Sequence, residues 1–516
     1  MAFEKQMDFL EKKRQWALAM GGREKIENQH RRGRYTARER IDRLLDADTF
    51  FEIGRFAHSD MPGMAQKTPA DSKITGFGKI NGRPVAVSAN DFTVMAATSS
   101  RVAGKKEIHI KRYAADKGLP LIYLGEAGGA RMPDIMGARG LSSFGGGGYD
   151  SFSRLMSRVR KNQFITAIMG ECYGMPTWMA CLSDFVVQVK GTAMGVSGPR
   201  VLELALREKV SDEELGGWRV HSEITGTIDR VAENEDHCFE LIRQYLSYMP
   251  AHRDELPPVY QCSPGSGAQM EEILSLLPEK RNRAYDMMKI LACIADRDSI
   301  FEIKPGFGRS VITALARMDG HSVGLIANQP MVSAGAMDTQ GIDKVTSFLC
   351  LCDSYNIPLL FFHDIPGFLV GREAERNRVA AKVMNYMNAL GQVTVPKIAV
   401  IVRKTYGMAF WNMAGTGCGT EFLVAWPTAE MSFVDPVIAA NVVAGSSPDR
   451  KAGKQEVIDA MINETSPFGA AGVFDIHDVI DPRHTRRYIV RALEIARNGA
   501  GGGIGEHRLA NWPTKF

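Results

Sequence analysis

The chain has 516 residues, 45% of them hydrophobic and 24% charged, and a net charge of +4. That length favours two or more domains, and so small a charge argues against nucleic-acid binding as the main role. The eight cysteines form no CxxC pair or Cys/His metal spacing, and no run approaches the ~20 apolar residues of a membrane helix. The charged start carries no signal-peptide core. We therefore expect reduced thiols and a cytoplasmic location, with the mitochondrial matrix left open.

The predicted elements alternate between helix and strand. Residues 1 to 45 have helical spacing and predict a helical arm, whose basic stretch 29–34 is a solvated face or, alternatively, a phosphate-binding patch. In the first half we predict strands near 83–89, 119–124, 164–169 and 185–190, and helices near 98–117 and 149–163. In the second half we predict strands near 322–327, 357–363, 397–402 and 422–425, and helices near 339–355 and 372–391. The alternation predicts an α/β fold with mainly parallel strands, and the proline-rich segment 250–280 is the predicted linker.

Several short matches recur in the same order in both halves. Residues 45–53 resemble 295–303 at an offset of 250, 85–90 resemble 323–328 at 238, and 120–124 resemble 358–362 at 238. Tyr173 and Tyr406 lie 233 residues apart, and Pro199 and Pro436 lie 237 apart. Nearly constant offsets predict a duplicated domain of about 240 residues. We place the two copies at residues 1–255 and 256–516.

The pattern Tyr-Gly-Met-x-x-Trp occurs twice, starting at Tyr173 and at Tyr406, each time after an apolar run. A strand that ends in a glycine turn and then starts a helix leaves backbone N–H groups unpaired. Such groups can hold a developing oxyanion. We therefore predict one oxyanion at each turn. The predicted catalytic residues are Gly174, Met175, Gly407 and Met408.

A glycine-rich turn follows one predicted strand in each half. The first contains Gly128, Gly129, Ala130 and Arg131, and the second contains Gly367 and Phe368. Paired glycines let the backbone approach a ligand closely, and an arginine can meet a phosphate or a carboxylate. The first turn is neither a Walker loop nor a dinucleotide fingerprint, so a purely structural turn is the alternative. The four glycines at 145–148 fit a loop over the substrate and a plain linker about equally well.

Candidate acids and bases lie near these turns. His221 and His363 have no Ser or Cys partner in a nucleophile motif, so no triad can be assembled and structural roles are favoured. Glu126, Glu171 and Asp364 lie at predicted strand ends, where they either orient loops or act as bases. The lack of a clear nucleophile or metal site favours chemistry driven by oxyanion stabilisation.

Motifs spread over nearly the whole chain resemble the carboxyltransferase (β) subunit of biotin-dependent acyl-CoA carboxylases, the propionyl-CoA and methylcrotonyl-CoA carboxylase group. They include Thr-Ala-Arg-Glu-Arg-Ile-Asp at 36–42, Gly-Gly-Ala-Arg at 128–131, Glu-Leu-Gly-Gly at 214–217, Asn-Gln-Pro at 328–330, Pro-Gly-Phe at 366–368 and Ala-Trp-Pro-Thr-Ala-Glu at 425–430. The resemblance implies tandem crotonase-like domains and a hexamer. It also implies an active site between the first domain of one subunit and the second domain of another.

The same resemblance implies the placement of the ligands. Acyl-CoA would lie on the first domain, with its enolate oxygen at the Gly174–Met175 turn. Biotin would lie on the second domain, with its ureido oxygen at the turn of Gly407, Met408 and Ala409. Residues 128–131 and 367–368 are expected to bind substrate. The chain has no Ala-Met-Lys-Met biotinylation site and no ATP-grasp region, so a partner biotin carboxylase and biotin carrier would supply that chemistry. No metal is expected.

Two other functions stay open. One is an acyl-CoA decarboxylase of the same fold, of the malonyl-CoA or methylmalonyl-CoA type. The other is a non-catalytic scaffold subunit of a carboxylase complex. The family usually has Gly-Gly at the first turn and often Gly-Gly or Ala-Gly at the second, where this chain has Met175 and Met408. The methionine side chains narrow the space at the two turns, so the sequence does not decide which acyl group the substrate carries.

Overall fold

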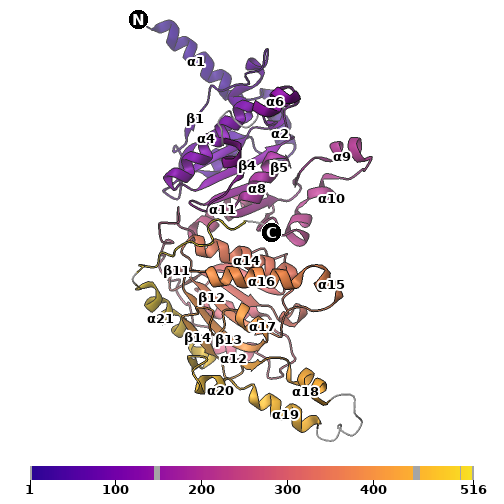
Figure 1. Cartoon of the computed structure of the whole chain (residues 1–516). Helices are drawn as coiled ribbons and strands as arrows, with labels where there is room; N and C mark the ends of the chain where they lie inside the picture. The colour runs from indigo at the N-terminus through magenta and orange to yellow at the C-terminus, as the bar shows by residue number, and fades with distance from the viewer. Residues whose placement is uncertain (1–2, 144–150, 445–453, 500, 514–516) are drawn as a thin grey trace. The chain divides into compact units, whose positions relative to one another are not determined.

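The computed structural model describes residues 3–143, 151–444, 454–499 and 501–513 (Figure 1). The chain forms two compact units, one that runs up to Ser247 and one that runs from Asp254 to Trp512. Between them, residues 248–250 belong to the second unit and residues 251–253 to the first, and Pro513 near the C-terminus also belongs to the first. The glycine stretch 145–148 lies outside the described residues.

The first unit is built on one mixed sheet with the order β1-β2-β3-β4-β5-β6-β8, and β7 pairs with the end of β5. Strands β1, β2 and β3 are antiparallel, and the strands from β3 to β8 run parallel. Every residue of β4 is buried, as expected for a parallel strand that is covered on both faces. The strands are β1 Phe51–Ile53, β2 Lys73–Ile80, β3 Arg83–Asn90, β4 Leu121–Ala127, β5 Phe164–Tyr173, β6 Phe185–Val189, β7 Ala193–Gly195 and β8 Arg230–Ala232.

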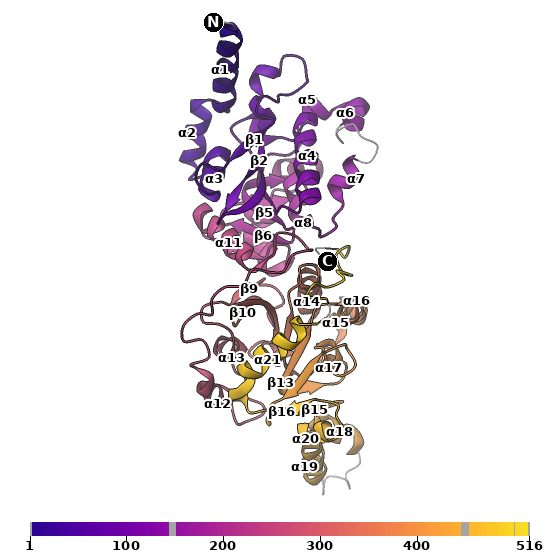
Figure 2. The ribbon, with the colours of Figure 1, turned by 90° about the vertical axis from the view of Figure 1, so that its left-hand side faces the viewer.

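Helices cover both faces of this sheet. Figure 2 shows α4 and α8 on one side and α3 and α11 on the other. Ile110 and Ala114 of α4 and Met179 of α8 share one apolar cluster with Phe164 of β5. The helices of this unit are α1 Glu4–Leu18, α2 Arg23–Arg31, α3 Ala37–Leu44, α4 Arg101–Lys117, α5 Met132–Ile135, α6 Gly137–Ser143, α7 Ser151–Met156, α8 Met175–Leu182, α9 Pro199–Leu206, α10 Asp212–Gly216 and α11 Glu235–Tyr248.

The second unit repeats the same sheet, with the order β9-β10-β11-β12-β13-β14-β16 and with β15 paired to the end of β13. Its antiparallel start and parallel centre also match the first unit. The predicted duplicated α/β fold is therefore confirmed. The strands are β9 Phe301–Ile303, β10 Val311–Met318, β11 His321–Asn328, β12 Leu359–Ile365, β13 Lys397–Tyr406, β14 Phe422–Ala425, β15 Glu430–Ser432 and β16 Asp478–Val479.

The helices of the second unit also form two layers. In Figure 2, α13 and α21 lie on one side of the sheet, while α14 and α16 lie on the other. Ile290 of α13 and Ile489 of α21 share a buried cluster with Val400 of β13. The helices are α12 Ile273–Leu276, α13 Met287–Ile294, α14 Thr339–Ser354, α15 Arg372–Arg376, α16 Val379–Gln392, α17 Met408–Asn412, α18 Pro436–Ala444, α19 Lys454–Glu464, α20 Pro467–Gly472 and α21 Thr485–Arg497.

Three predicted helices differ from the structure. The helix expected at 149–163 ends at Met156, because the Lys111 ammonium takes the carbonyl oxygens of Leu155 and Ser157. The helix expected at 372–391 is split into α15 and α16, with Arg378 between them in the left-handed region at φ 61°. The arm at 1–45 is three helices, with Gly22 at φ 90° starting the second.

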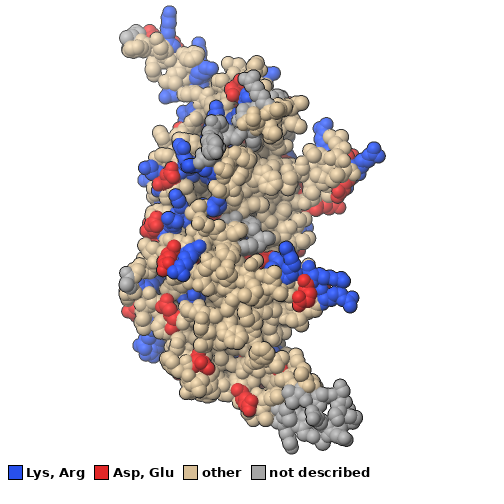
Figure 3. All heavy atoms as spheres, in the orientation of Figure 1, with Lys and Arg blue, Asp and Glu red and all other residues tan. Residues whose placement is uncertain are grey.

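The described surface carries both signs of charge. On the face in Figure 3, Lys and Arg side chains are interspersed with Asp and Glu side chains. Within the ranges given above, no helix is both long enough and apolar enough to cross a membrane.

Candidate active site

The first Tyr-Gly-Met turn is a sharp corner between β5 and α8. Gly174 stands at φ 78° and ψ −113°, a conformation that glycine adopts far more readily than other residues. The N–H of Gly174 donates to the carbonyl oxygen of Gly195 in β7, at 3.1 Å. The hydroxyl of Thr177 also holds the corner, because it lies within hydrogen-bond distance, 2.8 Å, of the carbonyl oxygens of both Cys172 and Gly195.

The second turn repeats this geometry between β13 and α17. Gly407 stands at φ 57° and ψ −142°, and its N–H donates to the carbonyl oxygen of Ser432 in β15, at 3.0 Å. A side chain at Gly407 would lie 2.9 Å from the carbonyl oxygen of Phe433, so this position also excludes larger residues sterically. Each corner is thus tied to a three-residue strand that follows later in the chain.

These bonds determine which amides are available. Because the N–H groups of Gly174 and Gly407 are already engaged within the fold, neither can serve as the oxyanion donor, and the prediction is corrected on this point. Among the hydrogen bonds of the described chain, none uses the N–H of Met175, Met408 or Ala409. Met175 and Met408 are the first residues of α8 and α17, where N–H groups have no partner inside the helix. The available donors are therefore the methionine amides.

A second pair of amides lies on the glycine-rich loops. Ser99 N–H donates to Gly129 O at 2.9 Å and Arg131 N–H donates to Ser99 O at 2.8 Å, so the intervening Ala130 N–H faces away from residue 99. The second unit copies this arrangement: Met337 N–H donates to Gly367 O at 3.2 Å and Leu369 N–H to Met337 O at 2.9 Å. The matching N–H there belongs to Phe368.

The loop and the corner of each unit start from neighbouring parallel strands. Ala127 of β4 pairs with Cys172 of β5, and Ile365 of β12 pairs with Thr405 of β13. The carboxyl ends of adjacent parallel strands meet at one edge of a sheet, which brings the loop amides and the methionine amide to the same edge. In the first unit, Met175 and Ser99 also line one small cavity of about 20 Å³.

Comparison with known proteins decides what this arrangement belongs to. Residues 28–503 match the family described as the carboxyl transferase domain. The chain belongs to the carboxyl transferase domain family.

Relatives of this carboxyltransferase align along nearly their whole length. It is 35% identical to the propionyl-CoA carboxylase carboxyltransferase subunit of Haloferax mediterranei, over 96% of this chain and 97% of the relative. It is 33% identical to the methylmalonyl-CoA decarboxylase subunit alpha of Veillonella parvula, over 95% and 96%. Among solved structures, transcarboxylase 12S with methylmalonyl-coenzyme A and methylmalonic acid bound has a TM-score of 0.89 at 33% identity, covering 96% of this chain and 95% of that one.

Two of the predicted binding residues have buried side chains in this carboxyltransferase. The Arg131 guanidinium lies inside the fold, 2.5 Å from the Asp71 carboxylate and 3.0 Å from the Ser72 hydroxyl. It anchors the glycine-rich loop and does not point at a ligand. Ala409 is fully buried, main chain included, so it is not exposed to a ligand in this chain.

The residues weighed as acids and bases are used structurally. Asp364 accepts from Arg403 Nε at 3.0 Å. His221 Nε2 lies 3.1 Å from the Met194 carbonyl oxygen, and burial lowers its pKa. Complete burial of His363 lowers its pKa to about 3, so this imidazole is neutral and enclosed. Within the described ranges, no cluster of His, Cys, Asp and Glu is arranged to hold a metal ion.

Acidic partners of the two motif tyrosines were missed by sequence reasoning. Tyr173 donates to Asp212, and Tyr406 donates to Glu430 at 2.6 Å. Burial and these hydrogen bonds raise the pKa of both tyrosines, so they stay protonated and brace the corners. The acids come from α10 and β15, and no local pattern pairs them with the tyrosines.

Glu171, at the carboxyl end of β5, binds the N-terminal arm. Arg34 Nη1 donates to Glu171 at 2.8 Å and to Glu126 at 3.0 Å, and Arg32 also pairs with Glu171. Two arginines of the basic stretch 29–34 are therefore occupied within the fold. Burial opposes ionisation of Glu171, but the hydrogen bond from Arg34 and the charges of the two arginines outweigh it and hold the pKa of Glu171 below its usual range.

We expect the ion pair between Arg34 and Glu171 to make the stability of the fold sensitive to acid. A carboxylate with a lowered pKa in the folded state stabilises the protein above its unfolded-state pKa, and the contribution is lost as the pH falls through the folded-state value. Glu171→Gln should therefore lose some stability at neutral pH and show a smaller further loss below pH 4.5 than the parent. Urea unfolding midpoints of the parent and of Glu171→Gln, measured at neutral pH and in acid, test this. Parallel losses in the two proteins would contradict it.

Proposed function

We propose that the two corners hold two oxyanions in one carboxyl transfer. On the first unit, the N–H of Met175 and a loop amide of Gly129 or Ala130 receive the enolate oxygen of an acyl-CoA thioester. On the second unit, the N–H of Met408 and the amide of Phe368 receive the ureido oxygen of biotin. Biotin on a partner protein supplies the carboxyl group when it is bound there.

One observation carries this proposal. The same donor arrangement, a helix-starting methionine amide beside a loop amide, occurs in both units with the glycine N–H already bonded to a short strand. Carboxyl transfer generates negative charge on two carbonyl oxygens, one on each reactant, and neither requires a nucleophilic side chain. Two matching pairs of amides, one in each unit, therefore suit two such oxygens. A non-catalytic scaffold would not require the holes to be kept in both copies.

The second hole fits the group that biotin presents. Met408 and Phe368 offer two main-chain donors, and a ureido oxygen is an acceptor that needs no cation or metal. We propose that the complete site pairs the first unit of one subunit with the second unit of another in a hexamer, with a biotin carboxylase and a biotin carrier as partners. A transcarboxylase 12S relative forms a hexamer, which supports this assembly.

We propose a short acyl group for the substrate, such as propionyl or methylmalonyl. The cavity beside Met175 measures only about 20 Å³, and its wall combines Leu155 and Ala103 with polar residues that include Lys73 and Glu107, so it leaves no room for a long acyl chain. Relatives are named for propionyl-CoA and methylmalonyl-CoA, which agrees with that size.

Decarboxylation of methylmalonyl-CoA is the second candidate, because two relatives are subunits of methylmalonyl-CoA decarboxylases. Incubating the purified protein with methylmalonyl-CoA, with and without a biotinylated carrier, separates the two reactions. For the transferase we expect carboxyl transfer from methylmalonyl-CoA to the carrier, and no CO2 release without it. Release of CO2 by the purified protein without any carrier would favour decarboxylation. If the purified protein acts on no acyl-CoA even with a carrier present, the non-catalytic scaffold subunit would be the remaining function.

A further inference from the structure

A buried polar cluster lies in the first unit, beside the corner of Met175. The Lys73 ammonium on β2 pairs with the Glu107 carboxylate on α4, with 2.5 Å between Nζ and Oε2. Asn90 Oδ1 accepts a second hydrogen bond from Lys73 Nζ, at 2.9 Å. The Ser88 hydroxyl donates to Glu107 Oε2 at 3.0 Å. Because burying two opposite charges costs about as much as their attraction returns, such a pair is weak evidence for a role in stability.

The second unit fills the same place without this cluster. The pairing of β2 with β3 matches that of β10 with β11 at the offset of 238 residues found in the sequence. Lys106 Nζ binds the Lys73 carbonyl oxygen, and Lys344 Nζ binds the Val311 carbonyl oxygen, which confirms the match. The polar residues Lys73, Ser88, Glu107 and Tyr123 therefore correspond to the buried apolar residues Val311, Ile326, Val345 and Phe361. Since the fold accepts an apolar set here, the polar set indicates a task of the first unit alone.

One oxygen of the cluster has no donor. The Glu107 side chain is 2% exposed, and within the described part of the chain no group donates to its Oε1. Glu107 lines the cavity of about 20 Å³ together with Met175 and Ser99. A cavity needs about 10–15 Å³ to hold one water, so this one has room for a water or a hydroxyl. Lys73 also lines it, but its ammonium is bonded to Glu107 and Asn90, so the open group is an acceptor.

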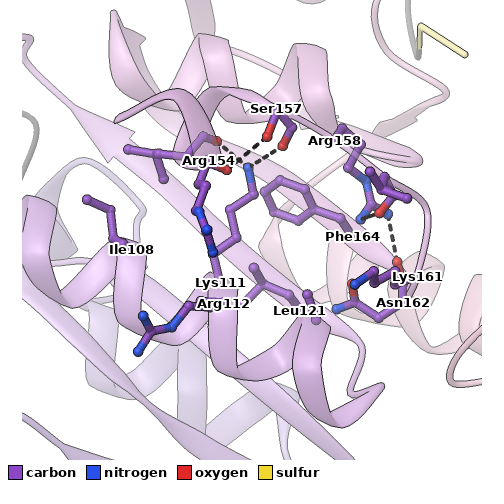
Figure 4. A pocket seen from close by; sticks show the side chains of 13 residues that line it. Ile108, Lys111, Arg112, Leu121, Arg154, Ser157, Arg158, Lys161, Asn162 and Phe164 are labelled. Atoms are coloured by element: carbon purple, nitrogen blue, oxygen red, sulfur yellow. Dashed lines mark hydrogen bonds between the residues drawn. The ribbon is translucent and has the colours of Figure 1, made fainter. Parts of the chain in front are cut away.

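A larger cavity in the same unit, of about 240 Å³, contrasts with this one (Figure 4). Two cations, Lys111 and Arg158, flank the Phe164 ring there, each 5.7 Å from the ring centroid. Lys111 binds carbonyl oxygens at the end of α7, and Arg158 binds the Asp184 carboxylate. The fold itself therefore satisfies these two cations, whereas the open oxygen of Glu107 requires a hydrogen-bond donor from outside the fold.

We propose that Glu107 is a specificity-determining residue that accepts a hydrogen bond from a hydroxyl group on the acyl chain. The preferred substrates are then CoA thioesters of short hydroxy acids. This inference rests on the proposed function, in which the thioester oxygen lies at the Met175 N–H and the acyl chain lies beside it. A hydroxyl on the first or second carbon after the carbonyl would lie near the cavity that Met175 and Glu107 share. A methyl group in its place would leave a buried carboxylate oxygen without a donor, which is costly.

Isosteric thioesters test the proposal by binding alone. Glycolyl-CoA and propionyl-CoA differ only in a hydroxyl in place of a methyl group, and 3-hydroxypropionyl-CoA and butyryl-CoA make the same comparison one carbon further along. Calorimetry on the full-length protein, without a biotin carrier, measures the four dissociation constants. We expect the hydroxyacyl member of at least one pair to bind roughly tenfold more tightly or better, because its hydroxyl donates to a buried charge. Equal affinities within both pairs would overturn the proposal, and water would then be the partner of Glu107.

The second unit supplies the variants. Lys73→Val/Glu107→Val introduces the residues that the second unit has at these positions, and it leaves neither charge unpaired. It should abolish the preference for the hydroxyacyl group. Tyr123→Phe also copies the second unit but keeps Glu107, so it should retain the preference. A preference that survives in a folded double variant, or that disappears in Tyr123→Phe, would contradict the role of Glu107. If the double variant does not fold, the four constants of the parent protein still decide.

Turnover separates this inference from the proposed function. With a carboxylated biotin carrier, kcat/KM within the discriminating pair should show the same preference as binding. A binding preference without turnover of any of the four thioesters would refute the proposed carboxyl transfer and leave the hydroxyl site in place. Turnover of both members of each pair, with equal affinity and equal kcat/KM, would refute the hydroxyl site and leave the carboxyl transfer in place.

Discussion

Met175→Pro is expected to lower the turnover number for carboxyl transfer by about 10²–10³-fold, the usual effect of losing one oxyanion donor. Proline has no N–H, and Met175 is the first residue of α8, the helix position that tolerates proline best. The substitution therefore removes the proposed donor and spares the bond from Gly174 N–H to Gly195 O. Steady-state carboxylation of propionyl-CoA with a carboxylated biotin carrier measures the effect.

Met175→Ala is the matched control. It keeps the N–H and removes only the side chain, so it should retain turnover within a few-fold while enlarging the small cavity beside Ser99 and Leu155. Thermal unfolding of both variants checks that the corner is intact. Similar turnover in a folded Met175→Pro protein and in Met175→Ala would remove the methionine amide from the mechanism. The pair Met408→Pro and Met408→Ala applies the same logic to the second corner.

Arg40→Met is expected to destabilise the first unit by about 3–5 kcal/mol, as is typical when one partner of a buried ion pair is removed. The Arg40 side chain is 1% exposed and donates to Glu126 at 2.5 Å, to Glu235 at 2.7 Å and to the Met169 carbonyl oxygen at 3.1 Å. Methionine fills a similar volume but leaves both carboxylates without this cation. Guanidinium unfolding followed by circular dichroism measures the change in the free energy of unfolding.

Arg43→Met on the same helix is its control. Arg43 pairs with Asp236 at 3.3 Å, but both side chains are about half exposed, so the loss should stay within about 1 kcal/mol. Equal losses of unfolding free energy in Arg40→Met and Arg43→Met would show that the buried ion pairs of Arg40 do not hold the N-terminal arm to the sheet.

Sequence reasoning located the corners but not their donors. The Tyr-Gly-Met pattern after an apolar run identifies a strand, a glycine turn and a helix start, and all three are present at Gly174 and Gly407. Which amide stays available depends on β7 and β15, strands of three residues whose pairing with β5 and β13 no local pattern reveals. The sequence therefore predicted the glycine and the methionine of each corner together, and could not separate the engaged glycine N–H from the methionine N–H.

Long-range side-chain contacts explain the other differences. Arg131 was expected to bind substrate because a guanidinium can pair with a phosphate or a carboxylate, but its partner Asp71 lies 60 residues earlier in the chain, which fits the structural alternative. The helix predicted at 149–163 stops early because Lys111, on another helix, captures its last carbonyl oxygens. Periodicity reports the preferences of one segment and contains no information on such partners.

The hydrogen bonds from the two glycine amides to β7 and β15 have a consequence for how this enzyme family can diversify. In the proposed mechanism, they separate the glycine that shapes each corner from the methionine whose N–H stabilises the oxyanion. Since the serving group is a main-chain amide, any residue except proline preserves it, and the adjoining side chain is free to change the size of the acyl chamber. In the proposed mechanism, a substitution at position 175 would change the cavity beside the corner and keep the main-chain donor, so Met175 would alter which acyl groups fit while oxyanion stabilisation stays in place.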